Sequence, residues 1–228
     1  MELVMVSHEF KCIFIHIPKC AGTSIESALG HLDGYQGRNG QDHRSIRLMA
    51  KPRLSLRTLT SKARLLDMAR SVRHQRRSDM NPKNKITVSD EQYKNYFKFT
   101  FVRNPWARAY SMYKNVIRDE AHKRTFGIEG DMSFKDFMHS FAGKGMLRPQ
   151  TYWLKDDNGD ISLDYVGRFE NLEEDFKEAC QRMGAQHIEL PHKIKGDGED
   201  YRQYYDEETR QLVSRIYRDE IEYFGYTF

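Results

Sequence analysis

The sequence predicts an α/β protein, a single P-loop-like domain in which helices flank a central parallel β-sheet. Two stretches support this prediction, residues 13–30 and 96–117, because each reads as a buried strand, a tight turn and a helix. Apolar runs of β-forming residues without polar alternation are typical of strands covered on both faces, as in parallel sheets. A chain of 228 residues fits one domain spanning 1–228.

Composition narrows the class of protein further. No apolar run is long enough to cross a membrane, and the N-terminus lacks the long apolar region of a signal peptide. The cysteines, Cys12, Cys20 and Cys180, are few and widely spaced, so we expect neither a disulfide framework nor a metal site. These features indicate a cytoplasmic protein without a transmembrane segment.

The first stretch reads IFIHIPKCAGTS from Ile13 to Ser24. Pro18 ends the strand, small residues form the turn, and the next helix ends at Gly30. A helix N-terminus after such a turn offers free backbone N–H groups and the positive end of a helix dipole, which bind phosphate or sulfate. It is not a Walker A loop, because Lys19 precedes the glycine. The predicted anion-binding residues are Lys19, Cys20, Ala21, Gly22, Thr23 and Ser24.

The second stretch reads YFKFTFVRNPWARAYSMY from Tyr96 to Tyr113. It predicts a strand over 97–102, with Asn104 as the N-cap and Pro105 as the first residue of a helix. The helix has one apolar face, formed by Trp106, Tyr110, Tyr113 and Ile117.

Together these two stretches resemble sulfotransferases that use 3′-phosphoadenosine 5′-phosphosulfate (PAPS). PKCAGTS is similar to their 5′-phosphosulfate-binding loop, and FVRNPWARAYSMY to their 3′-phosphate-binding element. The resemblance is to the carbohydrate branch, that of heparan 2-O-sulfotransferase and its bacterial relatives, and it implies a bacterial protein with the sulfotransferase fold. It also implies that Lys19 contacts the oxygen bridging phosphate and sulfate, and that Arg103 and Ser111 hold the 3′-phosphate. A guanidinium fork and a hydroxyl suit that task.

His43 is the predicted general base. DHRSIRLM resembles the KHATAREL-type segment of bacterial members, in which this histidine is the presumed base. Here Asp42 replaces the usual lysine, and it either raises the basicity of His43 or caps the next helix. The alternative is that His43 is a surface loop residue. We expect His16 to be buried and hydrogen-bonded behind the loop.

A basic segment separates the two motifs. Lys51–Arg77 contains nine Lys or Arg against Asp67 alone, a net charge of +8, which leaves −4 for the rest of a chain whose total is +4. We interpret about 51–84 as a basic lid or arm. It is either a solvated basic helix or a surface that grips an acidic glycan or lipid headgroup, including peripheral membrane contact. The uneven charge does not indicate a nucleic-acid-binding protein.

The remaining candidates come from the second half. Arg148 and Gln150, in MLRPQTYWL, are predicted acceptor contacts, because the segment resembles a family loop that lines the acceptor site. Either Lys193 or Lys195 is expected to reach PAPS. Arg108 lies between Arg103 and Ser111 in the sequence. It either belongs with these two predicted phosphate-binding residues or lies on the surface of the helix.

The sequence thus predicts an enzyme that moves a sulfuryl group from PAPS to a hydroxyl of a carbohydrate or glycolipid, with Lys19 and His43 as catalytic residues. PAP is the expected product, no metal is required, and the acceptor is either neutral or anionic. Two alternatives stay open: a P-loop-like kinase, and a non-catalytic module that binds PAP or an anionic glycan.

Overall fold

The computed structural model describes residues 5–34, 41–49, 65, 66, 68, 69, 72, 73, 76, 81–156, 158–191 and 200–228. A four-stranded sheet with the order β1-β2-β3-β4 lies at its centre. β2 pairs parallel with β3, and β3 pairs parallel with β4. The predicted α/β fold with a central parallel sheet flanked by helices is therefore confirmed. β1, which the sequence pattern does not predict, pairs antiparallel with β2 at one edge.

The strands are β1 (Val6–Ser7), β2 (Cys12–Ile15), β3 (Phe97–Val102) and β4 (Tyr165–Arg168). The α-helices are α1 (Gly22–Ala28), α2 (Ile46–Met49), α5 (Asp90–Asn95), α6 (Pro105–Ile117), α7 (Glu120–Phe126), α8 (Phe134–Phe141), α9 (Thr151–Leu154), α10 (Leu172–Arg182), α11 (Glu207–Ile216) and α12 (Arg218–Phe224). The 3-10 helices are η1 (Pro82–Lys85), η2 (Gly145–Leu147), η3 (Phe169–Asn171) and η4 (Tyr201–Tyr204).

β2 and β3 form the buried middle of the sheet. All residues of β2 are buried, as are those of β3 after Phe97, including the polar Lys98 and Thr100, and burial on both faces is typical of strands in a parallel sheet. Phe14 pairs with Phe99 in register, and their ring centroids lie 5.1 Å apart. Because the two strands are parallel, the loops that follow them emerge at the same edge of the sheet.

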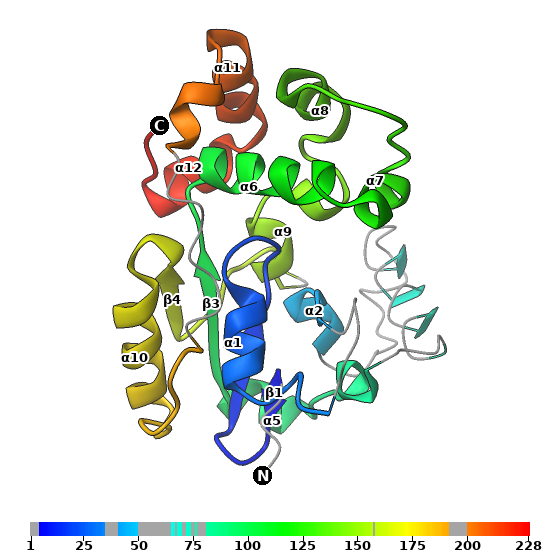
Figure 1. Ribbon diagram of the computed structural model, residues 1–228. Helices are drawn as coiled ribbons and strands as arrows, with labels where there is room; N and C mark the ends of the chain where they lie inside the picture. The colour runs from blue at the N-terminus through cyan, green and yellow to red at the C-terminus, as the bar shows by residue number, and fades with distance from the viewer. Residues whose placement is uncertain are drawn as a thin grey trace.

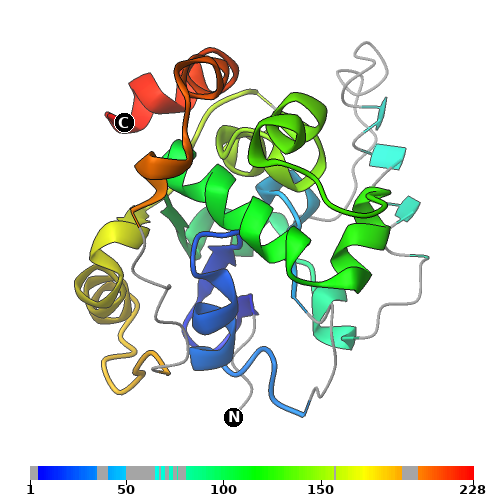
Figure 2. The ribbon, with the colours of Figure 1, turned by 45° about the horizontal axis from the view of Figure 1, so that its top comes forward.

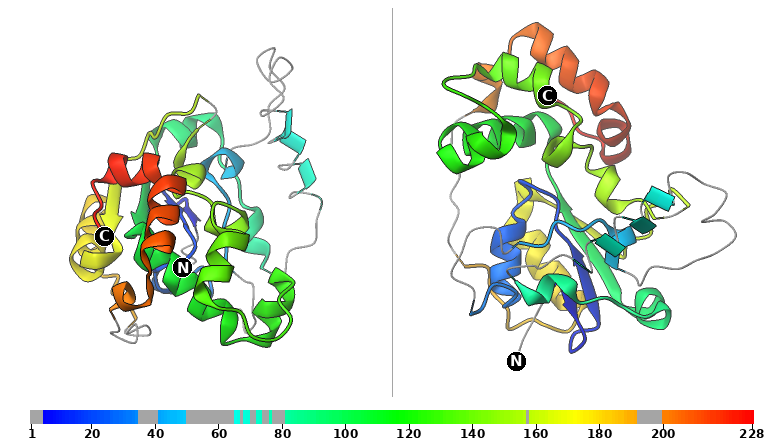
Figure 3. Two further views of the ribbon diagram at one scale, coloured as in Figure 1. Left: turned by 90° about the horizontal axis from the view of Figure 1, so that it is seen from above. Right: turned by 90° about the vertical axis from the view of Figure 1, so that its right-hand side faces the viewer.

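Helices cover both faces of the sheet and its carboxyl edge. α1 and α10 lie on one face (Figure 1), and α2 lies on the side opposite α1 (Figure 3, right). Helices α6, α8, α11 and α12 form a cap beyond the carboxyl ends of the strands, as the view from above shows (Figure 3, left). α6 crosses the end of the sheet at which α1 begins (Figures 1 and 2). The loop between β2 and α1 therefore lies beneath α6.

α6 begins as its sequence predicts. The Asn104 side chain accepts the backbone N–H groups of Trp106 and Ala107, and Pro105 is the first helical residue. Proline lacks an N–H where a helix would leave one unpaired, so it fits this position. The cap fixes where the chain turns after β3, and this places Arg103 at the mouth of the turn.

Most of the predicted basic arm at 51–84, and both Lys193 and Lys195, lie outside the described residues. The described residues between 65 and 76 are helical, with Leu65 and Leu66 exposed. The arm's role, and the prediction of one domain over 1–228, therefore stay predictions. Within the parts of the chain that the structure describes, no helix has the length and apolar character to span a bilayer.

Candidate functional site

The loop between β2 and α1 has an unusual backbone. Lys19 (φ 69°) and Ala21 (φ 63°) both lie in the left-handed region, which costs a non-glycine residue about 1–2 kcal/mol. Left-handed residues at alternate positions direct successive N–H groups to one side of the chain. These groups form a concavity that can bind an anion. No acceptor in the described part of the chain takes the backbone N–H of Ala21, Gly22 or Thr23. The loop thus has donors for a phosphate or sulfate, which fits the predicted anion cradle.

Arg108 holds this loop from the side of α6. Its Nε donates to the carbonyl of Pro18 at 3.1 Å, and its Nη2 donates to the carbonyls of Met146 and Arg148 at 2.9 Å each. The side chain is 1% exposed. The helix-surface alternative for Arg108 is therefore wrong, because a buried guanidinium needs the carbonyl acceptors that these three residues provide.

Gln150 fixes the main chain of Arg103. Its Oε1 accepts the Arg103 N–H at 2.8 Å, and its Nε2 donates to the Arg103 carbonyl at 2.9 Å and to Glu220 Oε1 at 3.0 Å. The Gln150 N–H also donates to the Glu220 carboxylate. Gln150 is 0% exposed, so in this conformation it presents nothing to an acceptor. The predicted contact between Gln150 and the acceptor stays a prediction.

The Arg103 side chain lies between the loop and an aromatic ring. Its Nη1 donates to the Lys19 carbonyl at 3.2 Å, and its Cζ lies 3.9 Å from the centroid of the Phe169 ring. Its Nε is buried without a hydrogen-bond partner in the described part of the chain. Burial lowers the pKa of Arg103. A buried donor without an acceptor is costly, and a bound phosphate would remove that cost.

Ser111 lies on the second turn of α6 and is partly buried. The two predicted 3′-phosphate ligands thus lie on consecutive parts of the chain, Arg103 directly after β3 and Ser111 within α6. Asn115 and Arg118 continue along the helix, and Arg118 Nη2 donates to Asn115 Oδ1 at 3.2 Å.

Lys19 titrates well below an ordinary lysine. Burial, together with the positive charges of Arg103 and Arg118, lowers its pKa to about 8. An anion bound in the loop would favour the charged ammonium and raise this pKa.

We expect the affinity for PAP to be constant below about pH 8 and to fall above it, with proton uptake on binding near pH 8. The affinity falls because Lys19 of the free protein loses its proton near pH 8, whereas Lys19 in the complex keeps its proton to a higher pH. Calorimetric titration in two buffers of different ionisation enthalpy measures this uptake. Lys19→Arg is the control, since arginine stays charged. Equal proton uptake by both proteins would exclude Lys19 as its source.

His43 lies beside a second histidine. Its ring centroid is 4.1 Å from that of His16, and its carbonyl accepts the Trp153 Nε1–H at 3.2 Å. Burial and the neighbouring His16 lower the pKa of His43 to about 3. Near pH 7 the imidazole is therefore neutral and able to accept a proton. His16 itself is buried and bonded to Glu26, as expected.

Asp42 acts to raise the pKa of His43, as one of the two expectations has it, but burial and His16 outweigh this effect and the pKa is lowered overall. Burial acts to raise the pKa of Asp42, but the Arg44 guanidinium beside it holds the pKa below its usual value. Arg44 Nη2 lies 2.6 Å from Asp42 Oδ2, and Arg44 Nη1 donates to the Ile86 carbonyl. Because Arg44 balances the charge of Asp42, burial and His16 dominate the pKa of His43.

Gly22 packs directly on the His16 ring. A Cβ at Gly22 would lie 1.8 Å from His16 Cδ2 and 2.1 Å from Nε2, and Glu26 fixes the ring by a 3.0 Å hydrogen bond.

Gly22→Ala is therefore expected to lower the free energy of unfolding by about 1–3 kcal/mol and to weaken PAP binding. Chemical denaturation and calorimetry measure the two effects. In a His16→Ala background the same change should cost less, because the clashing ring is gone. Equal costs in both backgrounds would contradict this steric account.

Arg148 stacks on Tyr152, next to Trp153. Its Cζ lies 4.5 Å from the Tyr152 ring centroid, and the Arg47 Cζ lies 5.2 Å from the same centroid. Trp153 in turn bonds the His43 carbonyl. This aromatic pair therefore connects two guanidinium groups to the segment that carries His43.

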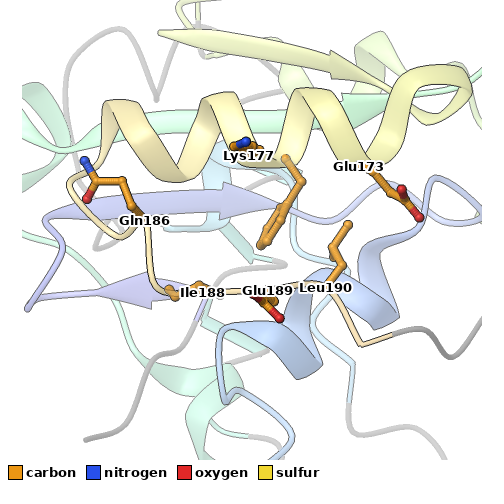
Figure 4. Close-up of a pocket in the computed structure, with 7 residues that line it drawn as sticks. Glu173, Lys177, Gln186, Ile188, Glu189 and Leu190 are labelled. Atoms are coloured by element: carbon orange, nitrogen blue, oxygen red, sulfur yellow. The ribbon is translucent and has the colours of Figure 1, made fainter.

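A separate cavity of about 320 Å³ lies beside α10. Figure 4 shows α10 above it and the segment around 186–190 below it. Its lining is mixed: Glu173, Phe176, Lys177, Gln186, Ile188, Glu189 and Leu190. None of the predicted site residues lines this cavity. The described residues also contain no cluster of three or more potential metal ligands.

The fold and the site define an α/β protein with a P-loop-like strand–loop–helix element. Comparison with known families is more specific: the sequence model of the sulfotransferase family matches residues 2–227. The chain therefore belongs to the sulfotransferase family.

Two relatives are similar over part of the chain. Carbohydrate sulfotransferase 14 of Danio rerio is 30% identical over 123 residues, which cover 44% of this chain and 34% of the zebrafish protein. An uncharacterized protein of Archaeoglobus fulgidus is 29% identical over 97 residues, 42% of this chain and 75% of that protein. The chain thus spans about a third of the zebrafish relative. No solved structure matches significantly.

Proposed function

We propose that the chain is a PAPS-dependent sulfotransferase that transfers a sulfuryl group to a hydroxyl of a carbohydrate or glycolipid. Family membership supports the reaction class. The observation that carries the donor assignment is the pair of anion-binding groups at one sheet edge, the loop after β2 and Arg103 after β3. A hydrogen bond of 3.2 Å from Arg103 Nη1 to the Lys19 carbonyl joins them.

The residues present fit a ligand with two anionic ends. The loop from Lys19 to Ser24 would hold the 5′-phosphosulfate through the N–H groups of Ala21, Gly22 and Thr23, which have no acceptor among the described residues, and through the side chains of Lys19, Thr23 and Ser24. Arg103, whose buried Nε has no partner among the described residues, and Ser111 would hold the 3′-phosphate. Cys20 would contribute no side chain to the phosphosulfate site, because its thiol is buried and lies 3.3 Å from Gln150 Oε1.

PAPS, when bound, supplies an activated sulfuryl group. Lys19 would stabilise the negative charge that grows on the leaving phosphate oxygen, an interaction stronger in the transition state than in the ground state. His43 would accept the proton of the acceptor hydroxyl, and its neutral imidazole suits this role. The cap of helices over the carboxyl edge would limit the access of water to this reaction.

We also propose that the acceptor carries an anionic group that Arg148 binds. Arg148 is partly exposed, stacked on Tyr152 and connected through Trp153 to the His43 segment. Stacking on an aromatic ring orders a guanidinium and leaves its edge free for a carboxylate or sulfate.

Arg148→Ala is expected to raise KM for an acidic polysaccharide acceptor at least about tenfold, because a charge-assisted hydrogen bond is worth about 1.5–3 kcal/mol. KM for a neutral acceptor and the Kd of PAP should stay unchanged. Steady-state kinetics with matched acidic and neutral polysaccharides measure the difference. An equal rise for both acceptors would argue against charge recognition.

The proposed function is tested by incubating the protein with sulfate-labelled PAPS and a panel of polysaccharides and glycolipids, without magnesium. Label in an acceptor fraction, dependent on Arg103, supports the sulfotransferase. Phosphate transfer from ATP with magnesium would instead favour the kinase. PAP binding without transfer to any acceptor would favour the non-catalytic module.

A further inference from the structure

Glu26 is a buried carboxylate that the proposed reaction does not use. It lies on α1 and is 0% exposed. One of its oxygens, Oε1, contacts His16 Nδ1 at 3.0 Å and accepts the Asp42 N–H at 2.9 Å. The other, Oε2, is buried without a partner in the described part of the chain. Such a group is costly to bury, so its position calls for an explanation beyond packing.

The two partners of Oε1 both lead to His43. The ring of His16 lies against the ring of His43, with centroids 4.1 Å apart. Asp42 is the residue immediately before His43, so its N–H fixes the main chain that carries the predicted base. A single oxygen atom on α1 thus sets both the neighbouring ring and the backbone of His43.

The charge around this group is balanced. Burial raises the pKa of Glu26 to about 8 and lowers that of His16 to about 3. Near pH 7 Glu26 is therefore protonated and His16 is neutral, so the pair carries no net charge. His31, His43 and Asp42 also face it, and Arg44 compensates Asp42. Glu26 acts to raise the pKa of His43, but burial and His16 outweigh it, so the contacts of Glu26 are its main means of acting on His43.

We propose that Glu26 is a positioning residue for His43, acting through the His16 ring and the Asp42 backbone. This inference rests on the proposed sulfotransferase function, in which His43 is the base. It explains why a carboxylate with only one engaged oxygen is kept on the buried side of α1.

A second buried carboxylate provides a matched comparison. Glu220 on α12 is also 0% exposed, but it bonds the N–H and the side-chain amide of Gln150. Gln150 fixes the main chain of Arg103. Glu220 thus supports the phosphate-binding end of the site, whereas Glu26 supports the end that carries His43.

The test compares the length of the side chain at position 26 with its carboxyl group. Glu26→Gln keeps the length and an accepting oxygen, while Glu26→Asp keeps the carboxyl group but withdraws the oxygen by one methylene. We expect kcat near that of the wild type for Glu26→Gln and about a hundredfold lower for Glu26→Asp, the cost of a shift of about 1 Å. The Kd of PAP should stay within about threefold in both. Glu220→Gln should show the reverse, with weaker PAP binding.

The proteins without any ligand provide an independent readout. Imidazole NMR signals of His43, assigned with a His43→Gln variant, should move in Glu26→Asp and stay close to the wild type in Glu26→Gln. Unmoved signals in Glu26→Asp, or an equal loss of kcat in both variants, would overturn the proposal. If instead the wild type fails to bind PAP, the proposed function fails, while the NMR comparison still decides whether Glu26 positions His43.

Discussion

His43→Ala is expected to lower kcat by about 10² to 10⁴ while leaving the Kd of PAP unchanged. Removing a general base costs about this much, and the imidazole is neutral near pH 7 because its pKa is lowered to about 3. Its protonation should therefore produce no acid limb near pH 6.5 in kcat/KM. Initial rates with labelled PAPS from pH 5 to 9 measure both effects.

His16→Ala is the matched control, because its ring lies 4.1 Å from that of His43 but is buried behind the loop. It should reduce kcat less than His43→Ala, since it removes a support and not the base. If His43→Ala retains full turnover while His16→Ala abolishes it, the assignment of the base is wrong.

Lys19→Met is expected to lower kcat by about a hundredfold, or about 3 kcal/mol, the usual cost of losing one donor to a developing anion. Methionine has a similar length and no charge, so the strained loop conformation at Lys19 should persist. The reason is that the ammonium gains interaction energy as charge moves to the leaving oxygen. Single-turnover rates at saturating PAPS separate this step from binding.

Lys19→Arg is the control, because it retains a cation of different shape and should recover part of the rate. The free energies of unfolding of both variants should match that of the wild type, since Lys19 supports the loop through its carbonyl and not its ammonium. A Lys19→Met enzyme with unchanged kcat and only a raised KM would mean that Lys19 binds ground state and transition state equally.

Local sequence patterns predicted much of this site. The loop after β2, the strand 97–102 and the Asn104 cap all depend on residues close in sequence, and the structure shows them as predicted. The same applies to His16, whose burial follows from its place in the apolar run 13–17, directly after β2.

The residues that hold the site in place could not be predicted from local sequence patterns. Arg108 bonds Pro18, and Gln150 bonds Arg103, over separations of 90 and 47 residues. Their partners are main-chain groups, which leave no signature in side-chain sequence. A single acid within a short helix of small and apolar residues, as at Glu26, is the one signal that could have indicated a buried partner.

Neighbouring charges also changed the properties of predicted residues. The sequence shows Asp42 next to His43 but not that Arg44 folds back to pair with Asp42 at 2.6 Å. It also does not show that the rings of His16 and His43 lie side by side. The pKa of His43 is therefore lowered, opposite to the rise expected from Asp42 alone. Burial and the His16 imidazole outweigh the Asp42 carboxylate, whose charge Arg44 balances.

The most direct test of the proposed PAPS site is a calorimetric titration of PAP into the purified protein and into Arg103→Ala, without magnesium. We expect wild-type binding near micromolar, about −8 kcal/mol, and its loss in the variant, whose free energy of unfolding should be little changed. Absence of binding to the wild type, or undiminished binding to Arg103→Ala, would contradict it.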